Sequence, residues 1–218
     1  MAKHYEQTAD FGKSFRRIFV RTGAMNSLAV KDIEQPAVAA SAVLVALGGN
    51  LASASGGARQ TLEAALTMMP ALGLRVRKVA SFYRTPSLST YIQEDYVNSV
   101  AELETALPPN ALLAVLHRIE ALFGRVRRDR WGPRMLDLDL LDYRGLIVPA
   151  VGQRGPEAGV GPLPLALPHP AIAERAFVLL PLRDVAPGWR HPVTGVSVDA
   201  LIRGLPADAL RGIERLGG

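Results

Sequence analysis

The sequence of this chain predicts an α+β fold, in which helices pack against an antiparallel sheet. Segments in which apolar and polar residues alternate, as they do in half-buried strands, are interleaved with segments in which apolar residues recur at helical spacing. The alternating segments are short, whereas strands of a parallel, doubly wound sheet are typically continuous apolar runs. Hydrophobic residues make up 49% and charged residues 21% of the 218 positions, which is enough apolar material for one packed core.

The predicted elements begin with a buried strand over the apolar run 42–47, followed by a tight turn at Gly-Gly-Asn, residues 48–50. Apolar residues at helical spacing then predict a helix over 62–69. Two alternating stretches, 74–82 and 96–103, predict strands that a long loop joins as an antiparallel pair.

The second half of the chain continues the alternation of helices and strands. A Pro-Pro pair at 108–109 predicts the start of a second helix, because proline is tolerated in the first helical turn, and Gly124 predicts its end. A Gly- and Pro-rich stretch, 149–164, predicts an inserted loop. The remaining residues predict a helix near 171–182 and a final amphipathic segment over 198–216.

The N-terminal residues differ from this pattern. Residues 1–41 mix charged residues, glycine and proline without sustained periodicity. Because chain termini without such a pattern are commonly disordered, we expect a flexible N-terminal extension. The catalytic domain would then comprise residues 42–218.

The composition excludes several kinds of site. The chain contains no cysteine, so disulfides, thiolate zinc sites and cysteine nucleophiles are excluded. The four histidines lack the spacing of zinc ligands, and Gly12-Lys13-Ser14 lacks the first glycine and the preceding strand of a P-loop. A net charge of +5 favours anionic partners. No apolar run approaches the roughly 20 residues that cross a bilayer, so we expect a cytoplasmic protein without a membrane partner.

A pair of aspartates is the first candidate for chemistry. Leucines at 136, 138 and 140 alternate with Asp137 and Asp139, which predicts a half-buried strand. Residues two apart in a strand point to the same side, about 6.5–7 Å from one another, so both carboxylates would share one face. Magnesium prefers one or two carboxylates together with substrate phosphates. Taken alone, however, such a pair more often faces solvent than binds a metal.

The residues just upstream favour the metal site. Residues 125–134 contain five arginines, a tryptophan and a Gly-Pro turn. Arginine binds phosphate oxygens bidentately, and a basic loop that faces a carboxylate pair suits phosphoryl transfer. A nucleic-acid-binding module is the competing interpretation, although carboxylates without a metal would repel a phosphate backbone. A third hypothesis is a non-catalytic domain that docks a partner through the N-terminal extension or the inserted loop.

The stretch 125–140, with its R-W-G-P-R-x-L-D-L-D core, closely resembles the signature of the 6-hydroxymethyl-7,8-dihydropterin pyrophosphokinases (HPPK) of folate biosynthesis. Further matching stretches occur in the family's order at 46–51, 81–86, 96–98, 118–120 and 167–170. The resemblance implies a ferredoxin-like α+β domain that transfers pyrophosphate from ATP to the pterin's hydroxymethyl group and releases AMP. It also implies two Mg²⁺ ions, with ATP and the dihydropterin as partners of a monomer that binds no nucleic acid.

By the same resemblance, candidate residues fall into three groups. The residues expected to bind magnesium or to stabilise the transferring charge are Asp137, Asp139, Arg125 and Arg134. The residues expected near ATP are His117, Glu120, Arg127, Arg128, Trp131, Leu140, His169 and Arg175. The residues expected at the pterin are Thr85, Pro86, Leu88, Tyr96, Asn98 and Phe177, with Tyr96 and Phe177 on opposite faces of the ring. Without the resemblance, these pocket residues would be assigned to the core and to cross-strand packing.

Two positions depart from the family pattern. Gly49 stands where the family usually has serine, a difference that we expect to affect the turn more than the chemistry. Pro164 lies near the usual place of a basic contact to the triphosphate, which Arg154 in the inserted loop could replace.

Overall fold

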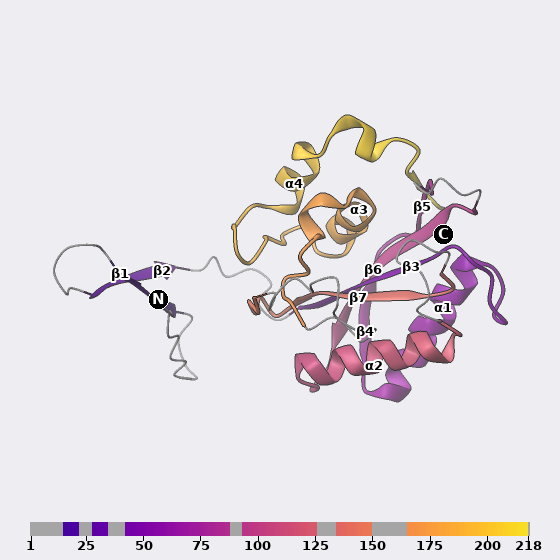
Figure 1. Cartoon of the computed structure of the whole chain (residues 1–218), viewed down its shortest axis with the longest axis horizontal. Helices are drawn as coiled ribbons and strands as arrows, with labels where there is room; N and C mark the ends of the chain where they lie inside the picture. Colours follow the sequence, from indigo (N-terminus) through magenta and orange to yellow (C-terminus); the bar gives the residue numbers. More distant parts are fainter. Residues whose placement is uncertain are drawn as a thin grey trace, which may run out of the picture. The chain divides into compact units, whose positions relative to one another are not determined.

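The computed structural model describes residues 15–21, 28–34, 42–87, 93–125, 134–149 and 165–217 (Figure 1). The chain divides into two compact units, Met1–Val38 and Ala39–Gly218. The first unit contains an antiparallel hairpin of β1 (Phe15–Arg21) and β2 (Leu28–Glu34). This hairpin was not predicted from the sequence, and the flexibility of the N-terminal extension stays a prediction.

The second unit is built on a six-stranded sheet with the order β7-β3-β6-β5-β8, in which β4 also pairs with β6. The strands are β3 (Val43–Gly49), β4 (Arg75–Val79), β5 (Tyr83–Thr85), β6 (Tyr96–Glu104), β7 (Asp137–Tyr143) and β8 (Glu214–Arg215). Each of these pairings is antiparallel. The predicted antiparallel α+β class is therefore confirmed.

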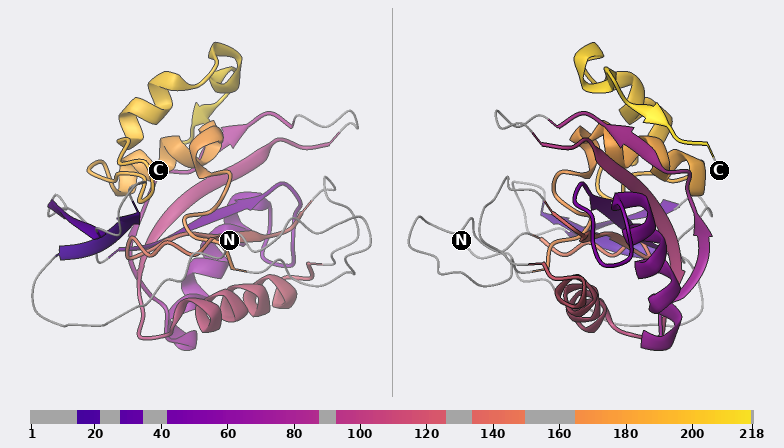
Figure 2. Two further views of the ribbon diagram at one scale, coloured as in Figure 1. Left: turned by 60° about the vertical axis from the view of Figure 1, so that its left-hand side comes forward. Right: turned by 90° about the vertical axis from the view of Figure 1, so that its right-hand side faces the viewer.

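Helices cover both faces of this sheet (Figures 1 and 2). The α-helices are α1 (Ala58–Met68), α2 (Pro109–Leu122), α3 (Ala176–Val185) and α4 (Val198–Gly204), and the 3₁₀ helices are η1 (Met69–Leu72), η2 (Ile172–Glu174) and η3 (Ala207–Leu210). One core cluster joins the sheet to α1 and α2, and it includes Leu62, Leu116 and Leu138. A second cluster joins the opposite face to α3 and α4, and it includes Val178 and Val198.

The central position of β3 explains its continuous apolar sequence. Val43, Val45 and Leu47 pack in the cluster with α1 and α2, whereas Leu44 packs in the cluster with α3 and α4. A strand that is buried on both faces needs apolar residues at every position. The predicted turn at 48–50 is wrong in one respect, because β3 continues in extended conformation through Gly49.

Two other predicted boundaries are corrected by the structure. The stretch 74–82, predicted as one strand, contains β4 alone, and the short strand β5 follows after a break at 80–82. The helix predicted near 171–182 is divided into η2 and α3, because Arg175 between them is extended, with φ −107° and ψ 103°. The antiparallel pairing that was predicted between the stretches 74–82 and 96–103 is confirmed, because both β4 and β5 pair with β6.

The amphipathic segment predicted over 198–216 is also divided. Its first part is α4, where the Ser197 hydroxyl accepts a hydrogen bond from the backbone N–H of Ala200 as an N-cap. The helix ends at Gly204, two residues before Pro206, which has no N–H with which to continue it. The end of the segment forms strand β8 on the edge of the sheet.

Candidate active site

One row of paired residues crosses three strands of the sheet. Gly48 on β3 is the register partner of Asp137 on β7 and of Asn98 on β6. Directly paired residues in an antiparallel sheet point to the same face, and neighbouring strands lie about 4.8 Å apart. The Asp137 carboxylate and the Asn98 amide are therefore on one face of the sheet, and Gly48, which has no side chain, lies between them. A Cβ atom on Gly48 would lie 2.8 Å from Asn98 Oδ1, so the glycine leaves room for this amide.

The two aspartates occupy the half-buried strand that the sequence predicted. Leu138 and Leu140 are buried in the cluster with α1 and α2, so the alternate positions face α3. Ala46, the register partner of Asp139, packs in the α3 cluster on that face. The side chain of Asp139 is 36% exposed and that of Asp137 is 21% exposed, so both carboxylates remain accessible.

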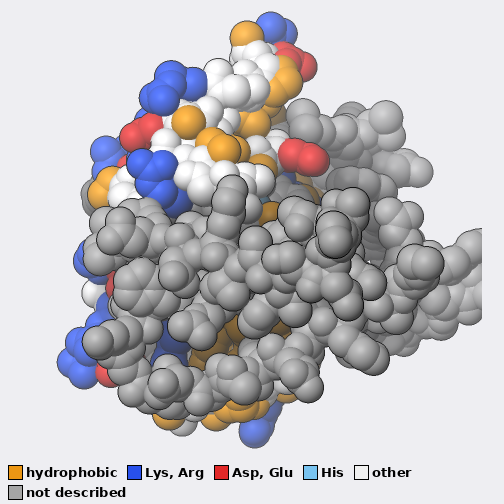
Figure 3. All heavy atoms as spheres, turned by 90° about the vertical axis from the view of Figure 1, so that its left-hand side faces the viewer, with side chains coloured by type: hydrophobic (Ala, Val, Ile, Leu, Met, Phe, Trp, Pro, Cys, Tyr) orange, Lys and Arg blue, Asp and Glu red, His pale blue; other side chains and the backbone are white. Residues whose placement is uncertain are grey.

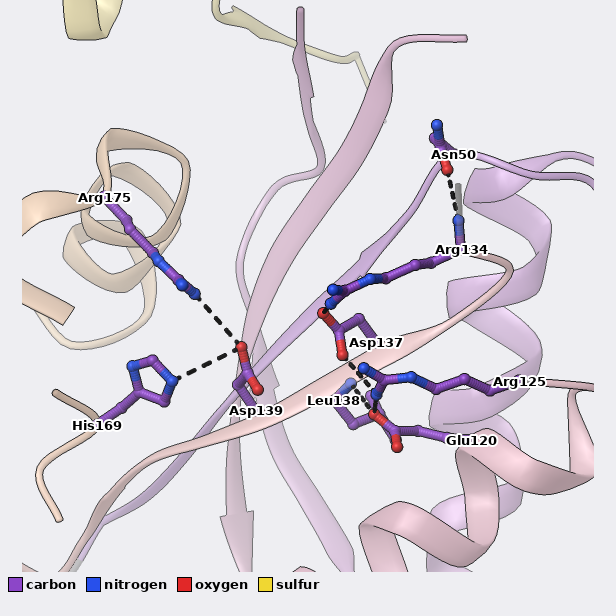
Figure 4. Close-up of polar contacts among 9 residues, drawn as sticks. All are labelled: Asn50, Glu120, Arg125, Arg134, Asp137, Leu138, Asp139, His169 and Arg175. Carbon is purple, nitrogen blue, oxygen red and sulfur yellow. Dashed lines mark hydrogen bonds and ion pairs between the residues drawn. The ribbon is translucent and has the colours of Figure 1, made fainter. Parts of the chain in front are cut away.

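Guanidinium groups from three segments reach these carboxylates (Figure 4). Asp137 Oδ1 lies 2.5 Å from Nη1 of Arg125, which follows α2, and its Oδ2 contacts Arg134, in the segment before β7. Asp139 Oδ2 lies 3.6 Å from Nη1 of Arg175 and 4.0 Å from Nε2 of His169. The structure thus brings together all four residues predicted to act on the metal or the transferring charge, and two of those predicted near ATP.

The predicted ATP residue Glu120 is placed underneath this cluster. Its side chain on α2 is 1% exposed, and Oε1 accepts a hydrogen bond of 2.8 Å from the backbone N–H of Leu138. The same oxygen contacts Arg125. Glu120 therefore joins α2 to β7 and orients Arg125, and we expect it to influence a nucleotide through that arginine.

Asn50 is a site residue that sequence analysis missed. Its backbone N–H donates to the carbonyl oxygen of Arg134 at 2.9 Å, and the Arg134 N–H donates to Asn50 Oδ1 at 2.8 Å. Its Nδ2 donates to the carbonyl oxygen of Glu94, at 3.1 Å, in the loop before β6. The buried Asn50 thus links the backbone of Arg134 to the end of β3 and to the loop before β6. The sequence signals were its place in the matching stretch 46–51 and an asparagine after a glycine pair, which also suits an ordinary turn.

Gly49 supports the same contact. A Cβ atom at this position would lie 2.5 Å from the carbonyl oxygen of Met135, so a side chain would displace the segment that carries Arg134. The sequence difference at Gly49 therefore bears on the position of a site residue as well as on the turn.

Three of the residues predicted to bind the pterin, Thr85, Tyr96 and Asn98, lie on the same face of the sheet. Asn98 and Thr85 are buried, and Asn98 Nδ2 donates to Thr85 Oγ1 at 2.8 Å. Tyr96 is the register partner of Thr85. Phe177, in the first turn of α3, lies with its ring centroid 5.8 Å from the guanidinium carbon of Arg175.

Two ionisable groups of the site have perturbed pKa values. Burial lowers the pKa of His169, and the nearby Asp139 carboxylate opposes this effect. The neutral imidazole is thereby favoured, and because its Nδ1 accepts from the Ala171 N–H at 3.2 Å, the proton is on Nε2, toward Asp139. Burial also raises the pKa of Tyr96; the Arg134 guanidinium opposes this shift, and the Asp137 carboxylate adds to it.

The remaining predicted residues are less directly placed. Leu140 is 3% exposed and faces the α1–α2 core, so we expect any contact with a nucleotide to use its backbone. His117 is half-buried on α2, and Pro86 is exposed after β5. The residues Leu88, Arg127, Arg128 and Trp131 lie outside the described residues, as do Arg154 and Pro164 of the inserted loop.

Comparison with known proteins assigns the family. The family model described as 7,8-dihydro-6-hydroxymethylpterin-pyrophosphokinase (HPPK) matches residues 44–187. This chain belongs to the HPPK family. It is 36% identical over 168 residues to the 2-amino-4-hydroxy-6-hydroxymethyldihydropteridine pyrophosphokinase of Synechocystis sp., a match that covers 77% of each chain. It is 40% identical over 178 residues to the enzyme of the same name from Pseudomonas aeruginosa, covering 81% of this chain and 97% of that one.

A solved structure supports the same fold. The crystal structure of Plasmodium falciparum HPPK-DHPS with pteroate superposes with a TM-score of 0.55 and 14% sequence identity, covering 74% of this chain and 42% of that chain. At this identity the likeness concerns the fold alone. Together with the family match, it confirms the resemblance predicted from the R-W-G-P-R-x-L-D-L-D core.

The site of this HPPK-family chain has a donor set suited to magnesium. Asp137 Oδ1 is buried and has no well-oriented hydrogen-bond donor among the described residues, although it forms an ion pair with Arg125. Among those residues, no group of three or more His, Cys, Asp or Glu side chains could enclose a metal by itself. A carboxylate pair is a donor set that fits Mg²⁺, which completes its coordination with substrate phosphates and water, and the arginines that now contact Asp137 would have to yield to the ion.

The surface bears on the competing interpretations. On the face shown in Figure 3, the coloured Lys and Arg side chains are interspersed with Asp and Glu and form no single basic patch. This distribution gives no support to an extended nucleic-acid surface on the described part of that face. Within the described residues, no helix is both long and apolar enough to span a membrane. The cytoplasmic location stays a prediction.

Proposed function

We propose that this chain transfers the terminal pyrophosphoryl group of ATP to 6-hydroxymethyl-7,8-dihydropterin and releases AMP. The hydroxymethyl oxygen forms a bond to the β-phosphorus and loses its proton to water. The bond between the β-phosphorus and the oxygen that bridges it to the α-phosphorus breaks, and AMP leaves with that electron pair. The observation that carries the proposal is the carboxylate pair on β7, which meets three arginines and lies in one row with Asn98, in a chain of the HPPK family.

Asp137 and Asp139 are the residues that would hold two Mg²⁺ ions. Support comes from their shared face on β7 and from the partial exposure of both side chains. When bound, magnesium neutralises phosphate charge and lowers the pKa of a coordinated hydroxyl group.

The arginines would stabilise the charge of the triphosphate. Arg125 and Arg134 contact one carboxylate, and Arg175 lies near the other, so phosphate oxygens that enter this cluster meet guanidinium groups on both sides. A guanidinium fork matches two phosphate oxygens, and its stabilisation is strongest in a partly buried site. The Asn50 contacts would fix Arg134 relative to the strands before substrate binds.

The pterin would bind beside this cluster, over β5 and β6. The hydrogen bond to Thr85 fixes the orientation of the Asn98 amide, which leaves its remaining polar capacity for the edge of a heterocycle. Tyr96 and Phe177 supply aromatic faces that suit a flat ring. Because Asn98 and Asp137 are two strand spacings apart, a ring held at Asn98 directs a substituent toward the carboxylates.

The direct test is product analysis. The protein is incubated with Mg²⁺, ATP and the dihydropterin, and we expect AMP and the pterin diphosphate in equal amounts. Asp137→Asn and Asp139→Asn should each lower kcat by about 100-fold or more, because each weakens a proposed magnesium ligand while keeping the side-chain shape. The exposed Asp208 provides the matched control, since Asp208→Asn should retain wild-type turnover. Formation of ADP, or full activity in both site variants, would refute the proposal.

We also propose that the protein is a monomer. Turnover per chain should be independent of protein concentration, and size-exclusion chromatography coupled to light scattering should give the mass of one chain.

A further inference from the structure

The C-terminal segment, residues 212–217, lies beyond the family match at 44–187 and runs along the edge of the sheet at β5. Its strand β8 pairs antiparallel with β5, with Arg215 opposite Tyr83, and the Leu216 N–H donates to the carbonyl oxygen of Phe82 at 2.8 Å. Figure 2 shows this strand beside β5. The segment thus covers the edge of the strand that leads to the proposed pterin residues.

Side-chain contacts fix the C-terminal segment to neighbouring elements. Arg215 Nε donates to Ser81 Oγ at 2.8 Å, and the carbonyl oxygen of Gly217 accepts from Arg59 Nη1, on α1, at 2.8 Å. Glu214 contacts Arg84 of β5. Several independent contacts therefore hold a short segment that would be only marginally stable as an isolated strand.

The same segment links the two walls of the proposed pterin pocket. The buried Tyr83 hydroxyl donates to Asp184 Oδ2 at 2.9 Å, and Arg215 Nη2 lies 3.7 Å from that oxygen. Asp184 belongs to α3, which also carries Phe177, whereas Tyr83 belongs to β5, which also carries Thr85. The spacing between β5 and α3 is thereby fixed at one carboxylate.

Gly212 makes the closest approach to the pocket. Its φ of +73° is in the left-handed region, and a Cβ atom there would lie 2.7 Å from Pro86 Cγ. The proline ring has no free end that could rotate away, so a side chain at 212 would displace the backbone at Pro86 or the C-terminal segment itself. Pro86 directly follows Thr85, which holds the Asn98 amide.

We propose that the C-terminal segment positions Thr85 and Pro86 for the pterin, and that Gly212 is a positioning residue for that substrate. The identity of the ligand rests on the proposed function. The inference adds a specificity element that lies outside the matched family region.

The test compares two glycine-to-alanine variants that share the same backbone strain. Gly195 has a φ of +70°, close to that of Gly212, but a Cβ atom there would have no neighbour within 4 Å. Gly212→Ala should weaken pterin binding at least fivefold, measured calorimetrically with Mg²⁺ and a non-hydrolysable ATP analogue, and should change affinity for the analogue less than twofold. Gly195→Ala should change both affinities less than twofold. An equal loss of pterin affinity in the two variants would overturn the proposal, as would an unchanged affinity in Gly212→Ala.

Hydrogen exchange provides a readout that does not depend on substrate. Gly212→Ala should accelerate amide exchange in β5, and Gly195→Ala should not. If Gly212→Ala fails to fold, Arg215→Gln should raise β5 exchange and weaken pterin binding, because it removes the contacts with Ser81 and Asp184. Unchanged exchange in β5 would refute the support by the C-terminal segment. A wild-type protein that does not bind the pterin would instead refute the proposed function, and with it the pterin part of this inference.

Discussion

Replacement of Glu120 tests whether the charged site depends on the contact between α2 and β7. Glu120→Ala removes the acceptor of the Leu138 N–H and one partner of Arg125. Loss of the acceptor leaves a buried donor unsatisfied, which costs about 1–3 kcal/mol. Loss of a buried ion-pair partner costs about 3–5 kcal/mol, but Arg125 keeps its contact with Asp137, which reduces this cost. We therefore expect a total destabilisation of about 3 kcal/mol.

The assay is urea unfolding followed by circular dichroism, with a thermal scan as a second measurement. For a domain of this size, a loss of about 3 kcal/mol lowers Tm by roughly 6–12 °C. Glu120→Gln keeps an oxygen for the Leu138 N–H and should lose only about 1 kcal/mol. Glu63, whose pair with Arg59 is exposed, is the control, and Glu63→Ala should cost about 0.5 kcal/mol or less. If Glu120→Ala costs less than about 1 kcal/mol, the reasoning is wrong.

Three further predictions concern the supports of the site. Asn50→Ala should lower kcat by about tenfold or more, because the Arg134 backbone N–H loses its side-chain acceptor, and steady-state kinetics would detect this loss. Gly49→Ser should destabilise the fold by about 1–3 kcal/mol in urea unfolding, because its Cβ would lie 2.5 Å from a backbone oxygen. Burial raises the pKa of Asp142, outweighing its hydrogen bond from Trp189 Nε1–H, so its contribution to stability should fall as pH rises from about 4 through the folded-state pKa. As the pH rises over that range, Asp142→Asn should accordingly become more stable relative to wild type. A variant that becomes less stable relative to wild type as the pH rises would contradict this sign.

The fold was largely predictable where local pattern and burial agree. The alternation of Leu136, Leu138 and Leu140 with the aspartates defined β7 because only one face of that part of the strand is packed. The Pro-Pro pair placed the start of α2 correctly at Pro109. By contrast, no local pattern predicts β8. This strand has only two residues, and it forms by pairing with the open edge of β5, which is distant in sequence.

The candidate site was predictable to the extent that residue types define its chemistry. Paired carboxylates and arginines indicate phosphate and metal binding, and the structure places Asp137, Asp139, Arg125 and Arg134 together. The role of Asn50 was not predictable, because it depends on backbone groups that approach only in the folded chain. The proposed substrate roles of these residues stay predictions.

The most direct test of the central claim follows the phosphorus atoms of ATP. The protein is supplied with Mg²⁺, the dihydropterin and ATP labelled with ³²P at either the β or the γ position. Attack at the β-phosphorus moves both labels to the pterin, and AMP retains neither. Transfer of the γ label alone, with the β label left in ADP, would contradict the claim.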